Sequence, residues 1–174
     1  MKKIIVANWK MYLTLSQSVA LAKKLSVHSR QCTDLRLVVW PSFVALEEVA
    51  KIIKRTKIGL GAQDVEPEAR GAYTGAVGLD DLGEIGVQYV LVGHSERRQH
   101  SGETDATVNK KLRAVLKAGM RPILCVGEPT RPSPHPLPRG EGDRRSGEGI
   151  WAAQKYAARQ VRAGLRSVSS KDLK

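Results

Sequence analysis

The chain has 174 residues, a length that favours one domain with a substantial core. Apolar residues make up 41% of it and aromatic residues 5%, so aliphatic side chains fill that core. No run approaches the roughly 18 apolar residues of a membrane span, and the apolar stretch at residues 4–7 is far shorter than the core of a secretory signal. These features predict a cytoplasmic protein that starts with a strand and has no membrane partner.

The net charge of +12 raises nucleic acid as a rival partner. Half of this charge lies in residues 129–174, which hold ten lysines and arginines against four acidic residues. The basic residues are scattered, and the chain has no RNP motif, zinc finger or basic stripe interleaved with aromatics. We therefore expect nonspecific attraction at low salt and no specific nucleic-acid binding.

The two cysteines, Cys32 and Cys125, are far apart in the sequence. Neither lies beside a CxxC or His-x-x-His motif, which predicts no metal site and a reducing compartment. Cys125 lies in an apolar run and is expected to be a buried structural thiol.

Five continuous apolar segments have the composition of strands that are buried on both faces of a parallel sheet. In chain order they are residues 4–7, 35–39, 58–62, 87–92 and 123–126. Segments with apolar residues at helical spacing lie between them, at residues 16–26, 44–53 and 107–118. Thr104 and Asp105 can cap the third of these helices, and Gly119 follows its end. The alternation predicts a parallel α/β fold, either an open doubly wound sheet or a closed barrel.

Polar residues follow the first strand directly. Asn8 and Lys10 stand at its carboxyl end, where both α/β layouts gather ligand-binding groups. Taken singly, each has an ordinary explanation as a turn former or a solvated lysine. No GxGxxG follows this strand, and no GxxxxGK[ST] occurs in the chain, so we expect no nucleotide cofactor.

The sequence Gly-His-Ser-Glu-Arg-Arg over residues 93–98 follows the fourth strand. Its glycine allows a sharp exit from the strand, and its serine and glutamate suit the start of a helix. The positive field of a helix amino terminus disfavours an imidazolium, so His94 is expected as a neutral ring that can donate a hydrogen bond to a substrate carbonyl. A lone histidine here is usually a hydrogen-bonded loop residue. Asn8 and Lys10, however, also follow the carboxyl end of a predicted strand, which favours one site shared by the three residues.

Six motifs, in family order, resemble the triosephosphate isomerase family. They are Ala-Asn-Trp-Lys-Met (7–11), Gly-Ala-Gln-Asp (61–64), Gly-Ala-Tyr-Thr-Gly (71–75), Gly-His-Ser-Glu-Arg-Arg (93–98), Gly-Glu-Thr-Asp (102–105) and Leu-Cys-Val-Gly-Glu (124–128). The resemblance covers residues 1–128 and implies an eight-stranded (β/α) barrel and a homodimer. It also implies an isomerase of glycolysis and gluconeogenesis that needs no cofactor and interconverts dihydroxyacetone phosphate and glyceraldehyde 3-phosphate through an enediolate.

The resemblance also implies residue roles. Asn8 and Lys10 would bind the triose phosphate, with Lys10 offsetting the charge of phosphate and enediolate. His94 would be the catalytic electrophile that shuttles protons between the two substrate oxygens, and Glu96 would support the site by hydrogen bonding around Lys10.

A second implied feature is a dimer loop that begins at Gln63 and has Thr74 near its tip. In the family such a loop reaches the active site of a partner subunit. The sequence departs from the family pattern at Ala76, where a glutamate commonly follows Thr-Gly, and this change weakens the expected dimer contact.

The character of the chain changes after Glu128. Residues 129–138 hold five of the eight prolines, and residues 139–149 are rich in glycine, arginine and glutamate. This composition predicts an extended, disordered segment, either an inserted foreign sequence or a reading error. Residues 154–168 are helical in pattern and resemble the family helix after the fifth strand. The predicted organisation is a partial barrel at 1–128, an insertion at 129–149 and a helix of the fifth βα unit at 150–174.

The predicted fold is therefore an incomplete (β/α)8 barrel with about five parallel strands and flanking helices. A complete barrel takes about 250 residues. The three βα units beyond residue 174 would include the catalytic glutamate base and the phosphate-binding loops that the resemblance implies. We therefore expect severely impaired isomerisation; the alternative is a non-catalytic remnant or a basic interaction fragment.

Overall fold

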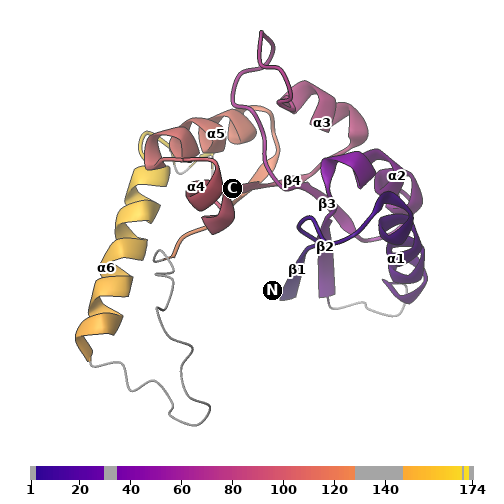
Figure 1. The fold of residues 1–174 in the computed structure, drawn as a ribbon, viewed down its shortest axis with the longest axis horizontal. Helices are drawn as coiled ribbons and strands as arrows, with labels where there is room; N and C mark the ends of the chain where they lie inside the picture. Colours follow the sequence, from indigo (N-terminus) through magenta and orange to yellow (C-terminus); the bar gives the residue numbers. More distant parts are fainter. Residues whose placement is uncertain (1–2, 30–34, 128–146, 170, 173–174) are drawn as a thin grey trace.

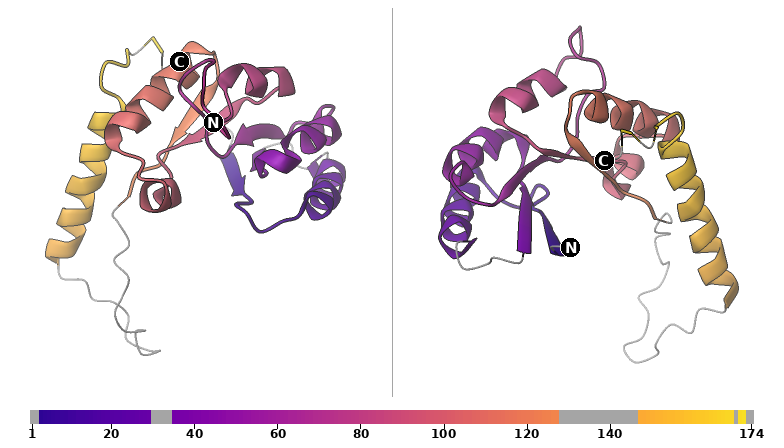
Figure 2. Two further views of the ribbon diagram at one scale, coloured as in Figure 1. Left: turned by 45° about the horizontal axis from the view of Figure 1, so that its top comes forward. Right: turned by 180° about the vertical axis from the view of Figure 1, so that it is seen from behind.

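Five parallel strands form one sheet in the order β1-β2-β3-β4-β5 in the computed structural model, which describes residues 3–29, 35–127, 147–169 and 171–172. The strands are β1 (Lys3–Asn8), β2 (Leu35–Trp40), β3 (Gly59–Ala62), β4 (Tyr89–Val92) and β5 (Arg121–Leu124). The sheet is curled, and helices lie along its outer side (Figure 1). The two further views in Figure 2 also show the helices on the outer side of the curled sheet. Because the sheet is curled and the helices lie on one side of it, the fold is an incomplete (β/α)8 barrel and not the doubly wound alternative.

Six helices accompany the strands within the described residues. They are α1 (Leu15–His28), α2 (Phe43–Ile53), α3 (Leu79–Ile85), α4 (Ser95–His100), α5 (Asp105–Lys117) and α6 (Gly147–Gly164). The three helices expected from apolar periodicity are α1, α2 and α5. Thr104 caps α5 as expected, because its side chain accepts a hydrogen bond from the amide of Thr107, and Gly119 follows the helix with φ +75°.

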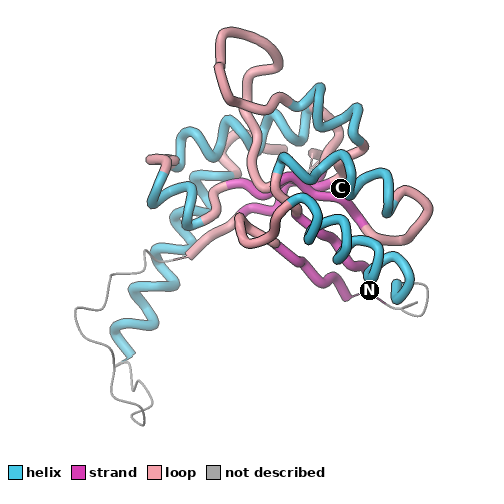
Figure 3. The backbone as a smooth tube through the Cα atoms, turned by 45° about the vertical axis from the view of Figure 1, so that its right-hand side comes forward, coloured by secondary structure: helices cyan, strands magenta, loops and turns pink. Residues whose placement is uncertain are grey.

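The outer face of the sheet and the helices share the larger core. Val39, Leu60, Val90 and Val92 from the strands pack there with Leu46, Val49, Leu112 and Val115 from the helices. The alternation of strands and helices along the chain is visible in Figure 3. Burial of these aliphatic residues explains the continuous apolar runs of β2, β3 and β4. The expectation of burial on both faces was wrong for β1, where Ile4, Ile5 and Val6 are 55%, 49% and 45% exposed.

The inner face carries a second cluster of Val38, Trp40, Tyr89 and Leu91. Glycines of β3 make room for its rings: a Cβ at Gly59 would lie 3.0 Å from Tyr89 Cε2, and one at Gly61 would overlap the Trp40 indole. Cys125 packs against this cluster and is half-buried, so the expectation of a buried thiol was too strong. Burial raises the pKa of the Cys125 thiol.

Helix α6 begins and ends earlier than the sequence pattern predicted. Its carboxyl end is fixed to α5, because Asn109 Nδ2 donates to the carbonyl oxygens of Gly164 at 2.7 Å and Arg166 at 2.9 Å. Gly164 also packs against Leu124 of β5. Helix α6 includes residues 147–149, the last three residues of the expected insertion; the other residues of the insertion, like Cys32, lie outside the described ranges. No helix within those ranges is long and apolar enough to cross a membrane.

Candidate functional site

The chain turns sharply where β1 ends, and this turn presents Lys10 at the carboxyl edge of the sheet. Lys10 has φ +53°, an unusual value for a residue with a side chain. The Asn8 side-chain oxygen accepts a hydrogen bond from the Lys10 amide at 2.9 Å and so supports this conformation. Gln63, which follows β3, donates from Nε2 to the carbonyl oxygens of Lys10 and Trp40, both at 2.9 Å. The backbone at Lys10 is therefore held from two sides.

An ion pair joins the two predicted halves of the site. Lys10 Nζ lies 2.7 Å from Glu96 Oε1, although 86 residues separate them in the sequence. Two strands lie between β1 and β4, so this contact depends on the curl of the sheet. The hydrogen bond to Glu96 raises the pKa of Lys10, and the same bond lowers the pKa of the Glu96 carboxyl. Lys10 thus remains a cation at physiological pH.

His94 is positioned by the exit from β4. Gly93 has φ +76°, and His94 is the N-cap of α4. Its Nδ1 accepts a hydrogen bond from the Glu96 amide at 3.3 Å, while Glu96 Oε2 lies farther away, at 3.5 Å. An accepting Nδ1 places the ring proton on Nε2 in a neutral imidazole. His94 can then present an N–H donor to a carbonyl oxygen.

Arg98 fixes the loop on which His94 stands. Its Nε donates to the carbonyl oxygen of Gly93 at 2.9 Å, and its Nη1 donates to Asp105 Oδ1 at 2.7 Å. Arg98 belongs to the motif at residues 93–98, but the sequence alone predicted no role for it. Asp105, the acidic residue at the start of α5, is the ion-pair partner that could have indicated this role.

A network of charged side chains lies behind the site, next to Gln63. Asp64 contacts Arg97 Nη2 at 2.7 Å and Lys111 Nζ at 2.5 Å, and Lys111 Nζ also lies 2.6 Å from Glu103 Oε1. Lys111 and Glu103 are buried. Sequence reasoning missed this network, although Lys111 stands out as a charged residue within the apolar stripe of α5.

The two residues assigned to a dimer loop are in different surroundings. Gln63 is part-buried at the base of the loop and supports Lys10 of its own chain. Thr74 is exposed in the loop over residues 63–78, which projects from the body of the molecule (Figures 1 and 3). The structure therefore brings together Asn8, Lys10, His94 and Glu96, adds Gln63 to them, and does not bring Thr74 into this group.

Within the described residues, no group of three or more histidine, cysteine, aspartate or glutamate side chains is arranged to hold a metal ion. What the site offers is an ammonium group, an imidazole N–H and an amide at one edge of a sheet. Such a set suits a ligand that carries or develops negative charge on oxygen.

Comparison with known proteins agrees with this chemistry. The family model for triosephosphate isomerase matches residues 3–136. The triosephosphate isomerase of Chloroflexus aurantiacus is 43% identical over 165 residues, which cover 95% of this chain and 60% of the relative. That of Herpetosiphon aurantiacus is 38% identical over 99% of this chain and 63% of its own length. That of Thermoanaerobacter pseudethanolicus is 50% identical over 73% of this chain and 51% of its own length. The chain thus spans between half and two-thirds of the length of these relatives.

Proposed function

The chain belongs to the triosephosphate isomerase family, and on that premise we propose that its site binds triose phosphate and carries the electrophilic half of the isomerase reaction. The reaction interconverts dihydroxyacetone phosphate and glyceraldehyde 3-phosphate. The observation that carries the proposal is the 2.7 Å contact between Lys10 and Glu96, which joins the end of β1 to the loop that holds His94. Asn8 and Lys10 are the proposed substrate-binding residues, and Glu96 holds Lys10 in place.

The chemistry follows from the proton balance of the reaction. A base removes a proton from the carbon beside the substrate carbonyl; the electron pair of that C–H bond forms the new carbon–carbon double bond, and the carbonyl π pair moves onto its oxygen. The base later returns the proton to the former carbonyl carbon. His94 Nε2–H donates to that oxygen and the ring recovers a proton from the neighbouring hydroxyl, so that one proton passes between the oxygens and the ring ends unchanged. The Lys10 ammonium offsets the negative charge of the enediolate and of the phosphate.

These 174 residues do not supply the rest of that site. The resemblance assigns the base to a glutamate in a later βα unit, and Glu96, the carboxylate beside His94, is already paired with Lys10. A positioned base contributes about 10²–10⁴-fold to the rate. We infer that the polypeptide of these 174 residues isomerises triose phosphates very poorly on its own.

The same premise supports three proposals about the protein as a whole. The protein catalyses a step of glycolysis and gluconeogenesis in the cytoplasm. It pairs as a homodimer through the loop that carries Thr74, with a contact weakened by Ala76. Residues 1–128 form the partial barrel, and its fifth βα unit is interrupted before it resumes in α6.

A chimera tests the assignment of the site. The carboxyl-terminal part of the Chloroflexus aurantiacus relative, beyond the segment matched here, is joined to this chain, and conversion of glyceraldehyde 3-phosphate is measured. We expect the chimera to be at least about 100-fold more active than the 174-residue chain, because a positioned base is supplied. His94→Asn and Lys10→Met in the chimera should each remove most of that activity.

Lys24→Met is the matched control, because Lys24 is exposed on α1. The 174-residue chain and its own His94→Asn variant give the background from trace host enzyme. A chimera whose turnover is unchanged by His94→Asn would refute the role of His94. Turnover by the 174-residue chain well above its His94→Asn variant would refute the proposed impairment.

A further inference from the structure

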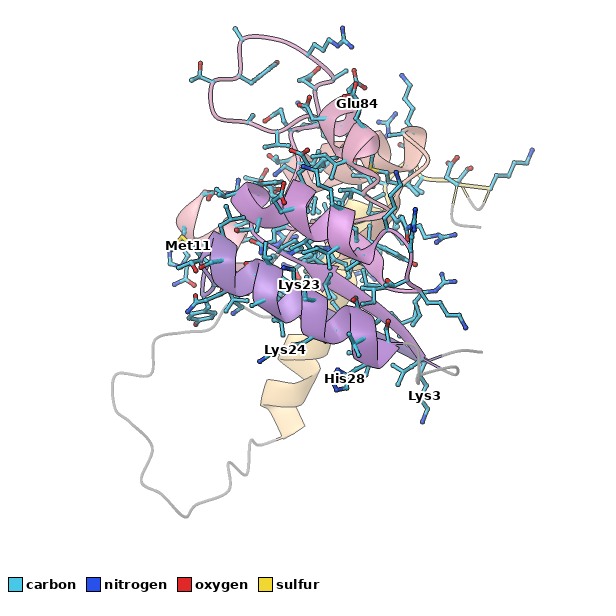
Figure 4. All side chains as sticks on the ribbon, turned by 90° about the vertical axis from the view of Figure 1, so that its right-hand side faces the viewer. Lys3, Met11, Lys23, Lys24, His28 and Glu84 are labelled. Atoms are coloured by element: carbon cyan, nitrogen blue, oxygen red, sulfur yellow. The ribbon has the colours of Figure 1, made fainter. Side chains whose placement is uncertain are left out.

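A cavity of about 390 Å³ opens at the opposite end of the strands from the site described above. It lies at the amino ends of β2, β3 and β5, and Arg36, Lys57, Gln88 and Arg121 are among its lining residues. Figure 4 shows how far apart the two ends are: Lys3, at the amino end of β1, and Met11, beyond its carboxyl end, appear at opposite sides of the molecule. The proposed isomerase site is therefore not involved in this cavity.

Two arginines converge on one phenol at this end of the sheet. Arg36 Nη1 lies 3.1 Å and Arg121 Nη1 lies 3.3 Å from the hydroxyl oxygen of Tyr89. Both guanidinium groups donate, so this oxygen accepts twice. Tyr89 itself is buried, at 4% exposed, and the guanidinium of Arg121 also stands 5.6 Å from the centre of its ring. The phenol thus holds both guanidinium groups in place.

The positive charge here has no acidic partner in the part of the chain that the structure describes. The ion pairs found among residues 3–29, 35–127, 147–169 and 171–172 include neither Arg36 nor Arg121 nor Lys57. The lining of the cavity contains three cationic residues and no carboxylate. All three cationic residues are exposed, so a small solute can reach them.

The same positive charge acts on the pKa of the Tyr89 phenol. Burial alone would raise the pKa of Tyr89, but the hydrogen bonds from Arg36 and Arg121 outweigh it and bring the pKa below its ordinary value of 10.0. Guanidinium groups that stabilise negative charge on a phenol oxygen also stabilise the negative charge of another oxyanion that binds beside them.

We propose that Arg36 and Arg121, held in place by the Tyr89 hydroxyl, form a binding site for a phosphate-type oxyanion at the amino-terminal end of the barrel, with Lys57 at its rim. Guanidinium groups bind oxyanions through paired N–H donors in a fixed fork, and here the phenol orients two of them. A doubly charged phosphate matches three cations better than a single carboxylate does. The phosphate group of a small metabolite and free inorganic phosphate share this chemistry.

The experiment titrates the purified 174-residue chain with inorganic phosphate and with pyrophosphate by calorimetry at constant ionic strength, and repeats the titrations with acetate. We expect saturable binding of the phosphates and weaker binding of acetate. Arg36→Gln and Arg121→Gln should each weaken phosphate binding by about tenfold or more, because each removes a charge-assisted hydrogen bond.

Two control variants separate this site from other cations. Arg162→Gln removes the same charge from an exposed position on α6 and should leave phosphate affinity within about twofold. Lys10→Met disables the proposed isomerase site and should leave intact the part of the phosphate binding that Arg36→Gln weakens. Arg36→Lys keeps the charge without the fork and should fall between wild type and Arg36→Gln, provided that each variant retains the wild-type circular dichroism spectrum. Pyrophosphate binding tighter than that of inorganic phosphate supports a metabolite as the source, and equal affinity supports free phosphate.

Several results would overturn the proposal. These are no saturable phosphate binding, the same loss in Arg162→Gln as in Arg121→Gln, and acetate binding as tight as phosphate binding. Loss of the binding in Lys10→Met with no effect of Arg36→Gln would place the phosphate at the isomerase site instead. That outcome would leave the proposed function intact and refute the second site.

Discussion

Lys111→Met should be among the most destabilising single substitutions in this chain. The Lys111 side chain is 6% exposed and the side chain of its partner Glu103 is 3% exposed, so this ion pair is almost completely withdrawn from water. Neither carboxylate oxygen of Glu103 receives a well-aligned hydrogen bond from the described residues. The nearby positive charge of Lys111 is therefore what compensates for burying this carboxylate.

The expected loss follows from which charges remain. Asp64 keeps its 2.7 Å contact with Arg97 when Lys111 is replaced, but Glu103 loses its only ion-pair partner within the described ranges. Removing one member of a buried ion pair costs about 3–5 kcal/mol, because the other charge is left uncompensated. We expect this much to be lost from the free energy of unfolding, a large share of a typical total of about 5–15 kcal/mol.

Equilibrium unfolding in urea, followed by circular dichroism, measures the loss. Lys110→Met is the matched control, because it makes the same change at the neighbouring, exposed position of α5 and should shift stability by no more than about 0.5 kcal/mol. The double variant Lys111→Met/Glu103→Leu removes both charges and should recover much of the lost stability. If Lys111→Met and Lys110→Met unfold at the same urea concentration, or if the double variant is the least stable, the argument from buried charge is wrong.

Two further predictions concern the site and the inner face of the sheet. The pKa of the Glu96 carboxyl is lowered by Lys10, so this stabilisation is present above the unfolded-state pKa and is lost as the pH falls through the folded-state pKa. Lys10→Met should raise the pKa of Glu96 towards its ordinary value of 4.5, as followed by carboxyl NMR, and an unchanged pKa would show that the ion pair does not form in solution. Gly61→Ala should destabilise the chain by about 1–3 kcal/mol in urea unfolding, because the added Cβ overlaps the buried ring of Trp40. Gly127→Ala, where a Cβ meets nothing within 4 Å, is its control, and equal stability of the two variants would contradict the packing argument.

The sequence was enough to predict the strands and long helices, because burial leaves a clear pattern in both. The boundaries depended on pairing that the pattern does not record. The fifth strand was expected at residues 123–126 but begins at Arg121, which pairs with Tyr89 of β4. Pro122 lies before the apolar run but inside the strand, because β5 is an edge strand and proline is tolerated there.

Helices α3 and α4 were not predicted as elements, since their seven and six residues are too few for an apolar period to be recognised. Single capping residues, and not an apolar pattern, determine where these two helices begin or end. Helix α3 ends at Gly86, which has φ +87°, and α4 starts from the side chain of His94. Ser95 and Glu96 indicated a helix start without indicating how short the helix is.

The site itself was predicted at the level of residue types, whereas its supports were not. Sequence motifs brought Lys10, His94 and Glu96 to one edge of a parallel sheet, and the structure places them there. Gln63 was predicted only as the first residue of the dimer loop, because a motif does not show where an amide points. In the structure its side chain bonds two backbone carbonyls within the chain.

The hydrogen bonds that hold the site all come from the first five βα units. Gln63 and Asn8 fix the backbone of Lys10, and Arg98 fixes the exit from β4 that carries His94. The electrophilic groups can therefore be ordered without the strands that would complete a barrel. Lys10 and Glu96 nevertheless have side chains that are 39% and 47% exposed, and water screens their charges at such exposure. Stabilisation of a developing oxyanion depends on excluding that water, so under the proposed function we expect this set of donors to bind charge more readily than it accelerates the reaction.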